Sequence, residues 1–106
     1  MSKESEVQKA IIEYLHLMKI WNYRNNSGAL KTERGHFVRF GAKGSPDIIC
    51  VIDGQYVGIE CKSHSGRQSE HQKAFQEGLE EHGGAYCLAR SVDDVIEFLD
   101  KQKSPG

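Results

Sequence analysis

The chain has 106 residues and a net charge of −1, which allows one domain with a modest core. No apolar run is long enough to span a bilayer and the first residues are too polar for a secretory signal, so we expect no membrane association. Three cysteines, an odd number, lie in apolar runs (Cys50, Cys61 and Cys87), which indicates buried thiols in a reducing cytoplasm.

Helices and strands are predicted in the order α-β-β-β-α-β-α from the spacing of apolar residues. The hairpin strands are apolar on both faces, so we expect an α/β fold with a mixed sheet flanked by helices. Residues 1–100 would form a single domain, followed by a flexible tail at 101–106. The elements in chain order are a helix (3–19), a strand (20–25), a candidate short strand (36–40), a hairpin (47–52 and 55–62), a helix capped by Ser69, a strand (85–89) and a helix capped by Ser91.

The predicted hairpin carries the most informative residues of the chain. An Asp-Gly pair at residues 53 and 54 predicts a two-residue type I′ turn. Counting outward from this turn places Asp47 directly across from Glu60, with Cβ atoms about 4.5–5.5 Å apart, and Lys62 projects from the same face. Two carboxylates this close repel unless a cation lies between them, and Mg²⁺ favours oxygen ligands. The hairpin therefore predicts a small metal-dependent hydrolytic site.

The first helix has an acidic residue where an apolar one is expected. Glu4 falls within the apolar arc, near Val7 and Ile11, and Glu6 falls at its edge. An inward carboxylate is explained by a metal, or by a frayed first turn in which the acid interacts with the helix dipole.

Charge is distributed unevenly along the chain. Residues 19–43 carry six Lys and Arg against one acid, whereas residues 70–100 carry eight acids against two basic residues. Either a polyanion approaches the basic half or both halves are ordinary solvated surface. Two aromatic residues in this region, Trp21 and Tyr23, are expected to pack in the core rather than to stack on bases.

Pro46-Asp47 followed by Glu60-Cys61-Lys62 resembles the core motif of the PD-(D/E)XK nucleases. More narrowly, the chain resembles the VRR-NUC domain in its stand-alone phage and bacterial form. The resemblance covers nearly the whole chain and implies a restriction-endonuclease-like fold in a bacterial or phage-infected cell. The further matching segments are Glu4 to Gln8, Gly44 to Ile49, Gly66 to Gln72 and Tyr86 to Leu99.

The resemblance implies a divalent-metal-dependent endodeoxyribonuclease with Mg²⁺ or Mn²⁺ as cofactor. Lys62 would orient or activate the attacking water, and Gln72 would lie near the metal. Because Gln72 also completes a capping box with Ser69, a role in the site and a role as a helix cap both stay open. The implied metal ligands are Glu4 (with Glu6 as the alternative), Asp47, Glu60 and the backbone carbonyl of Cys61.

DNA, branched or duplex, is the expected partner. A basic stretch would hold its backbone mostly without reading sequence. The residues concerned are Lys31, Arg34, Arg39 and Lys43. A single-site domain that cuts two strands symmetrically works best as a homodimer, as in a Holliday-junction resolvase. The alternatives are a flap-directed, nick-directed or non-specific nuclease, a non-catalytic nucleic-acid-binding module, and a structural domain in which the Asp47–Glu60 pair is a coincidence.

Overall fold

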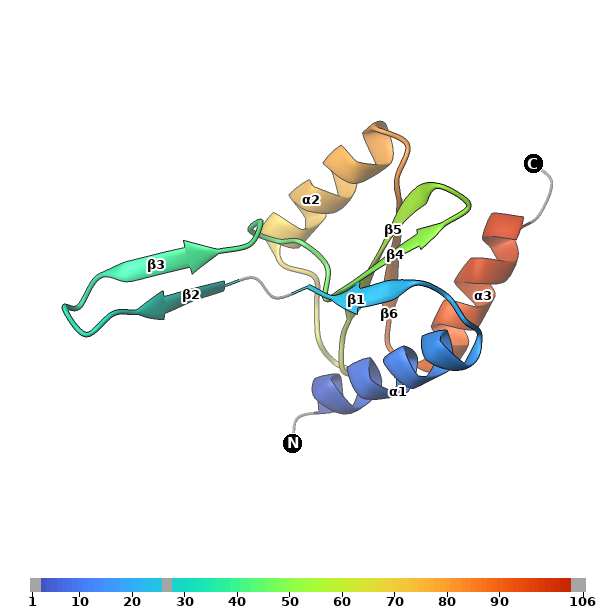
Figure 1. Ribbon diagram of the computed structural model, residues 1–106, viewed down its shortest axis with the longest axis horizontal. Helices are drawn as coiled ribbons and strands as arrows, with labels where there is room; N and C mark the ends of the chain where they lie inside the picture. The colour runs from blue at the N-terminus through green and yellow to red at the C-terminus, as the bar shows by residue number, and fades with distance from the viewer. Residues whose placement is uncertain (1–2, 26–27, 104–106) are drawn as a thin grey trace.

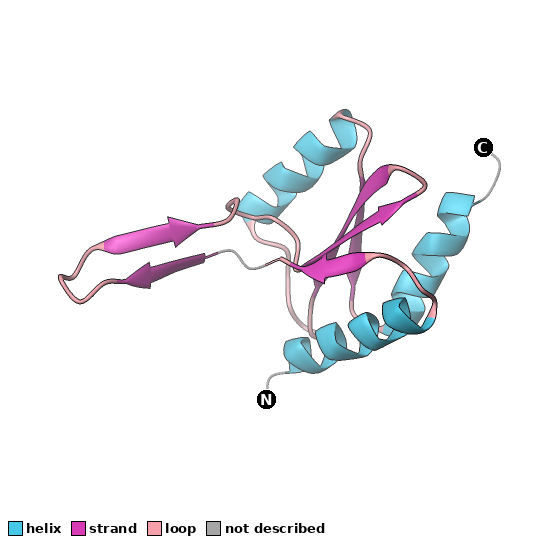
Figure 2. Cartoon of the chain, in the orientation of Figure 1, coloured by secondary structure: helices cyan, strands magenta, loops and turns pink. Residues whose placement is uncertain are grey.

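The computed structural model describes residues 3–25 and 28–103, and only the backbone of residues 28–30, 38–40 and 103. Three helices surround a four-stranded sheet, and a separate two-stranded hairpin extends from this body (Figures 1 and 2). The elements are α1 (Lys3–Leu17), β1 (Asn22–Arg24), β2 (Gly28–Lys31), β3 (Phe37–Phe40), β4 (Ile48–Ile52), β5 (Gln55–Cys61), α2 (Glu70–Glu81), β6 (Ala85–Ala89) and α3 (Val92–Lys103).

The sheet is mixed, as expected. Its strand order is β1-β4-β5-β6, in which β1 and β5 pair antiparallel to β4, and β6 pairs parallel to β5. The crossover between the two parallel strands is α2. Leaving the β2–β3 hairpin aside, the elements follow the predicted order α-β-β-β-α-β-α.

The main core lies between one face of the sheet and the helices α1 and α3. Successive side chains of a strand point to opposite faces of the sheet, so every second residue of β4, β5 and β6 is buried on this face. The core residues from the two helices include Ile11 and Leu15 of α1 and Val95 and Leu99 of α3.

The second face of the sheet is covered only in part. Helix α2 lies over it next to β6, where Gly84 is in close contact with Leu79 (Figure 1). The other end of this face stays open, because β1 is an edge strand and no described helix covers it. Trp21 and Tyr23 are accordingly 63% and 47% exposed and meet edge to face, so the prediction that both pack in the core is wrong.

The structure differs from the prediction at the end of the last helix and gives the candidate short strand a partner. Helix α3 continues to Lys103, so residues 101–103 are helical and do not belong to a flexible tail. The ion pair between Lys101 and Glu97, four residues apart, supports this last turn. The candidate short strand exists as β3, but it pairs with β2, which the sequence did not predict. Among the described residues, no helix has the length and apolar character to cross a membrane.

Candidate metal centre

The β4–β5 hairpin brings Asp47 and Glu60 together. Turn residues 53 and 54 both have positive φ, 51° and 80°, as a type I′ turn requires. The ladder pairs every residue of β4 with its predicted partner in β5 and ends with Ile48 opposite Ile59. One step further along the two chains, Asp47 and Glu60 face each other at the end of the ladder. The predicted register is confirmed.

Helix α1 adds a third carboxylate to this pair. One oxygen each from Glu4, Asp47 and Glu60 can be chosen so that all three atoms lie within 4.8 Å of one another. Glu6 is exposed and borders a different hollow, beside Arg90. The helix-one acid of the cluster is therefore Glu4, and Glu6 is not part of it.

Asp47 is held by hydrogen bonds on both its side chain and its backbone. Its Oδ2 accepts a hydrogen bond of 2.8 Å from the backbone N–H of Cys61, and its carbonyl accepts one of 2.8 Å from the N–H of Asn25. The Asn25 side chain also donates to Ser45 Oγ and to the Pro46 carbonyl, at 2.8 and 2.9 Å. The segment that contains Asp47 is thus hydrogen-bonded to β5 and to the residue that follows β1.

Glu60 is 1% exposed and has one satisfied and one unsatisfied oxygen. Its Oε2 accepts a 2.8 Å hydrogen bond from Gln72 Nε2 and lies 3.6 Å from Lys62 Nζ. Its Oε1 is buried and has no hydrogen-bond partner in the described part of the chain. A buried carboxylate oxygen without a partner is costly, so this atom needs a proton, a water or a cation beside it.

Gln72 caps α2 and also contacts Glu60, so the helix-cap role is confirmed and the role in the site stays a prediction. Its backbone N–H donates to Ser69 Oγ at 3.2 Å, and its Oε1 accepts from the Ser69 N–H at 2.8 Å, which completes the capping box of α2. The amide nitrogen of the same side chain donates to Glu60. The start of α2 is therefore coupled directly to the acidic cluster.

Electrostatics oppose three carboxylates at this position. Burial, followed by the neighbouring Asp47 carboxylate, raises the pKa of Glu60 to about 8, and the Lys62 ammonium offsets only part of this. Among the described residues, the Lys62 ammonium therefore does not fully compensate the carboxylates. Oxygen ligands at this spacing fit a small divalent cation, and Glu4, Asp47 and Glu60 are the side chains that could hold one.

The thiol of Cys61 is a poor candidate for a metal ligand. Cys61 is fully buried, and burial together with the nearby carboxylates raises the pKa of its thiol far above the usual value. Its N–H orients Asp47. Ligation through the Cys61 carbonyl, which the resemblance implies, remains a prediction.

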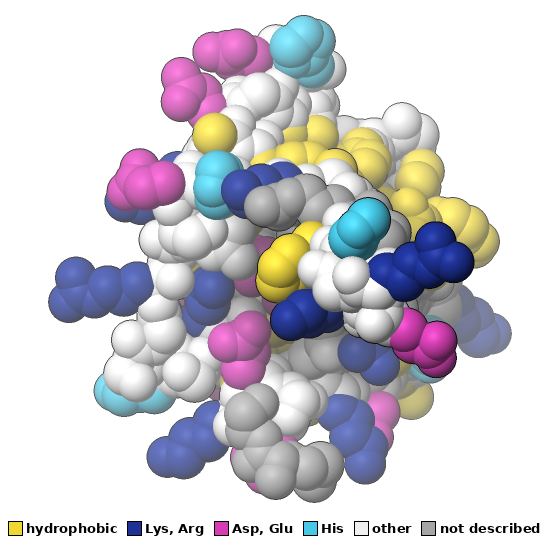
Figure 3. All heavy atoms as spheres, turned by 90° about the vertical axis from the view of Figure 1, so that its left-hand side faces the viewer, with side chains coloured by type: hydrophobic (Ala, Val, Ile, Leu, Met, Phe, Trp, Pro, Cys, Tyr) yellow, Lys and Arg dark blue, Asp and Glu magenta, His cyan; other side chains and the backbone are white. Residues whose placement is uncertain are grey.

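The predicted nucleic-acid-binding residues lie on and next to the β2–β3 hairpin and are not members of the three-carboxylate cluster. Lys31, Arg34 and Lys43 are exposed. Arg39 is opposite Ala29 in the hairpin ladder, and its side chain lies outside the described part of the structure. Figure 3 looks onto the hairpin end of the molecule and shows Lys and Arg side chains distributed around this face.

Arg90 is a supporting residue that the sequence did not reveal. Its Nη1 donates to the carbonyls of Ser63, His64 and Gly66 at 2.7, 3.3 and 2.7 Å. This loop begins directly after Lys62, so Arg90 limits where the loop and the end of β5 can move. Its only sequence signal is an arginine after a strand, which is too common to single out.

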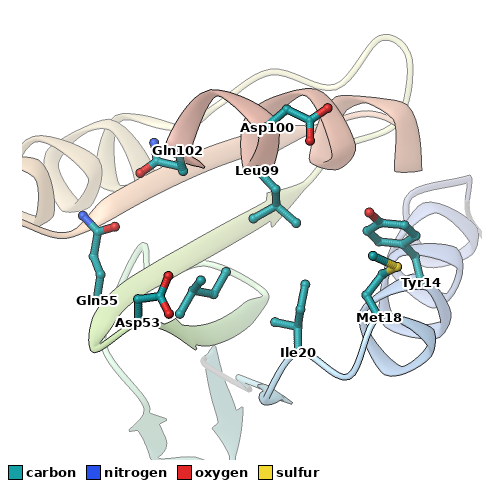
Figure 4. A pocket seen from close by; sticks show the side chains of 9 residues that line it. Tyr14, Met18, Ile20, Asp53, Gln55, Leu99, Asp100 and Gln102 are labelled. Carbon is teal, nitrogen blue, oxygen red and sulfur yellow. The ribbon is translucent and has the colours of Figure 1, made fainter. Parts of the chain in front are cut away.

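A second concave region lies at the other end of the sheet, next to the β4–β5 turn (Figure 4). Tyr14, Met18, Ile20 and Leu99 supply most of the apolar lining of this cavity of about 320 Å³. Among the described residues its lining forms no cluster of metal-ligating groups. The five residues of β4 separate it from Asp47 by about 17 Å, so it is independent of the acidic cluster.

No known family model matches this chain, and no curated protein sequence is significantly similar to it.

Proposed function

We propose that this protein is a divalent-metal-dependent endodeoxyribonuclease of the PD-(D/E)XK type, related to the VRR-NUC domain, with Mg²⁺ or Mn²⁺ as cofactor. One observation carries the proposal: three carboxylates converge beside a lysine, and one buried oxygen of Glu60 lacks a partner. Three carboxylates this close cost folding free energy unless a cation or a proton compensates them, and a metal centre gives the arrangement a function.

Each residue of the centre has a distinct task under this proposal. Glu4, Asp47 and Glu60 would hold the metal, which would act as a Lewis acid and lower the pKa of a bound water. The Cys61 N–H keeps the Asp47 carboxylate in place, and the Gln72 amide does the same for Glu60. Both contacts leave one further oxygen of each carboxylate available as a ligand.

Lys62 supplies the positive charge for the reaction. Its Nζ lies 3.6 Å from Glu60 Oε2, and the residue is 9% exposed, so the ammonium is held at the cluster rather than free in solvent. At this position it would orient the attacking water and stabilise the negative charge that develops on the phosphoryl oxygens. A phosphodiester is anionic, so the carboxylates alone would repel it and activity should require metal.

The preferred substrate is a branched DNA such as a Holliday junction, cut by a homodimer. A single site must act twice to cut a junction symmetrically, and a two-fold dimer presents two sites in equivalent orientations. Light scattering at micromolar concentration should show a dimer. A monomer that still makes paired cuts would contradict this part of the proposal.

The deciding experiment is cleavage of labelled four-way junction, flap and linear duplex DNA with Mg²⁺ or Mn²⁺. Lys62→Ala should abolish cleavage, whereas Lys73→Ala, which removes an exposed lysine from α2, should cut like the wild type. Paired junction cuts lost only in Lys62→Ala would support a resolvase. Metal-dependent cutting of flap or linear duplex DNA alone would keep the nuclease and change the substrate. Binding without any cleavage would refute the nuclease and favour a binding module.

A further inference from the structure

The β2–β3 hairpin is an arm that extends away from the folded body (Figure 1). Its two strands pair with each other and form no ladder with the four-stranded sheet. The molecule measures 53 Å along its longest axis against 32 and 26 Å across, and the hairpin forms one end of that axis. A two-stranded hairpin has little stability of its own, so one that stands clear of the core calls for a binding role.

The arm starts at the acidic cluster. On the outgoing side, Asn25 donates its N–H to the Asp47 carbonyl immediately before the chain enters the arm. On the return side, the chain passes through Gly44, which has a φ of 80° and packs so closely on the backbone of His71 that a Cβ would collide with it. Both ends of the arm are therefore held in place within a few residues of the acidic cluster or of Asp47 itself.

The described side chains of the arm are cationic and aromatic. Lys31, Arg34 and Lys43 are exposed, and between residues 28 and 43 Glu33 is the single acid in the sequence. Phe37 is 74% exposed and pairs with Lys31 in the ladder. A polyanion with apolar base edges fits this surface. A second copy of the arm does not, because it would bring like charges together.

The dimensions of the arm select the type of nucleic acid. A two-stranded β-ribbon fits the major groove of B-DNA, which is about 12 Å wide and exposes a distinct pattern of groups for each base pair. The major groove of an RNA duplex is too narrow for side chains to read. Four paired residues span about 13 Å, which matches roughly four base pairs at about 3.4 Å each.

We infer that the β2–β3 hairpin enters the major groove of duplex DNA to one side of the cut, where its ladder covers about four base pairs. Lys31, Arg34 and Lys43 contact phosphates, and Phe37 contacts base edges. This inference rests on the proposed nuclease function for the position of the cut, and on the arm's own surface for the groove. Cleavage then requires duplex DNA next to the cleaved bond, so single-stranded DNA is a poor substrate.

The test compares two charge reversals of equal size at opposite ends of the molecule. Arg34→Glu lies on the arm, and Lys101→Glu lies on the last turn of α3. Arg34→Glu should weaken duplex binding about tenfold or more and lower the slope of log affinity against log salt by about 1. Lys101→Glu should change binding less than about twofold. Phe37→Ala should weaken binding several-fold without changing the salt slope.

Two readouts separate this inference from the proposed function. The first is Mg²⁺-dependent hydrolysis of bis(4-nitrophenyl) phosphate, which is too small to reach the arm and should be unaffected by Arg34→Glu. The second is a photo-crosslinker on Arg34→Cys, which should map to the duplex on one side of the cut. The native thiols of Cys50, Cys61 and Cys87 are at most 4% exposed, so labelling is directed to position 34.

Three results would overturn the inference. The first is that Arg34→Glu binds duplex as well as Lys101→Glu does. The second is that Arg34→Glu also loses hydrolysis of the small phosphodiester, which would mean that the arm supports the site itself. The third is that Arg34→Glu dissociates a dimer, which would make the arm a contact between copies. If the wild type hydrolyses no phosphodiester but its duplex binding depends on Arg34, the arm is supported and the nuclease function fails.

Discussion

Glu60→Gln tests whether the acidic cluster is strained in the absence of a cation. Burial and the Asp47 carboxylate raise the pKa of Glu60 from 4.5 to about 8. Because the folded protein binds this proton more tightly than the unfolded chain does, its contribution to stability is complete below about pH 4.5. The contribution is lost as the pH rises through about 8. At about 1.4 kcal/mol per pH unit, the loss reaches about 3 kcal/mol at pH 7 in the metal-free protein.

Glutamine removes the charge and keeps an oxygen that can accept the hydrogen bond from Gln72. We therefore expect Glu60→Gln in EDTA to be about as stable as the wild type at pH 5 and more stable by a few kcal/mol at pH 8. With Mg²⁺ the wild type should be the more stable of the two proteins, because the ion stabilises the wild type and the variant lacks one of its ligands. The assay is urea unfolding at pH 5, 7 and 8, with EDTA or with Mg²⁺.

The control is Glu70→Gln, which neutralises a side chain that is 90% exposed on the first turn of α2. It should show neither the pH-dependent gain nor the loss of Mg²⁺ stabilisation. The reasoning is refuted if the difference between Glu60→Gln and the wild type does not grow from pH 5 to pH 8. It is also refuted if Mg²⁺ stabilises the two proteins equally.

Further predictions concern the groups that support the cluster. Ser69→Ala should lower stability by about 1 kcal/mol through loss of the helix cap, whereas Gln72→Ala should also weaken stabilisation by Mg²⁺; thermal unfolding with and without Mg²⁺ separates the two. Gly58→Ala should cost about 1–3 kcal/mol in urea unfolding, because its Cβ would lie 2.5 Å from the neighbouring proline ring. Gly78→Ala meets nothing within 4 Å on α2 and should stabilise by about 0.5–1 kcal/mol. Arg90→Ala should release the loop at 63–66, which limited proteolysis would detect as faster cleavage there, and Arg90→Lys should restore protection only in part.

Local chemistry is what made much of the fold predictable. The Asp-Gly turn sets the register of β4 and β5 by itself, and the register alone places Asp47 across from Glu60. The capping box at the start of α2 is likewise complete within four residues. Short-range signals such as these depend on backbone geometry over a few residues, so they can be read without knowing how the chain packs.

Packing decided what the sequence left open or predicted wrongly. The choice of Glu4 over Glu6 depends on how α1 is rotated against a sheet strand more than forty residues away. Trp21 and Tyr23 alternate like core residues, yet they are exposed because they lie on and beside an edge strand whose outer face α2 does not reach. Hydrophobic patterning reports which residues can be buried, and only the arrangement of the layers determines which of them are.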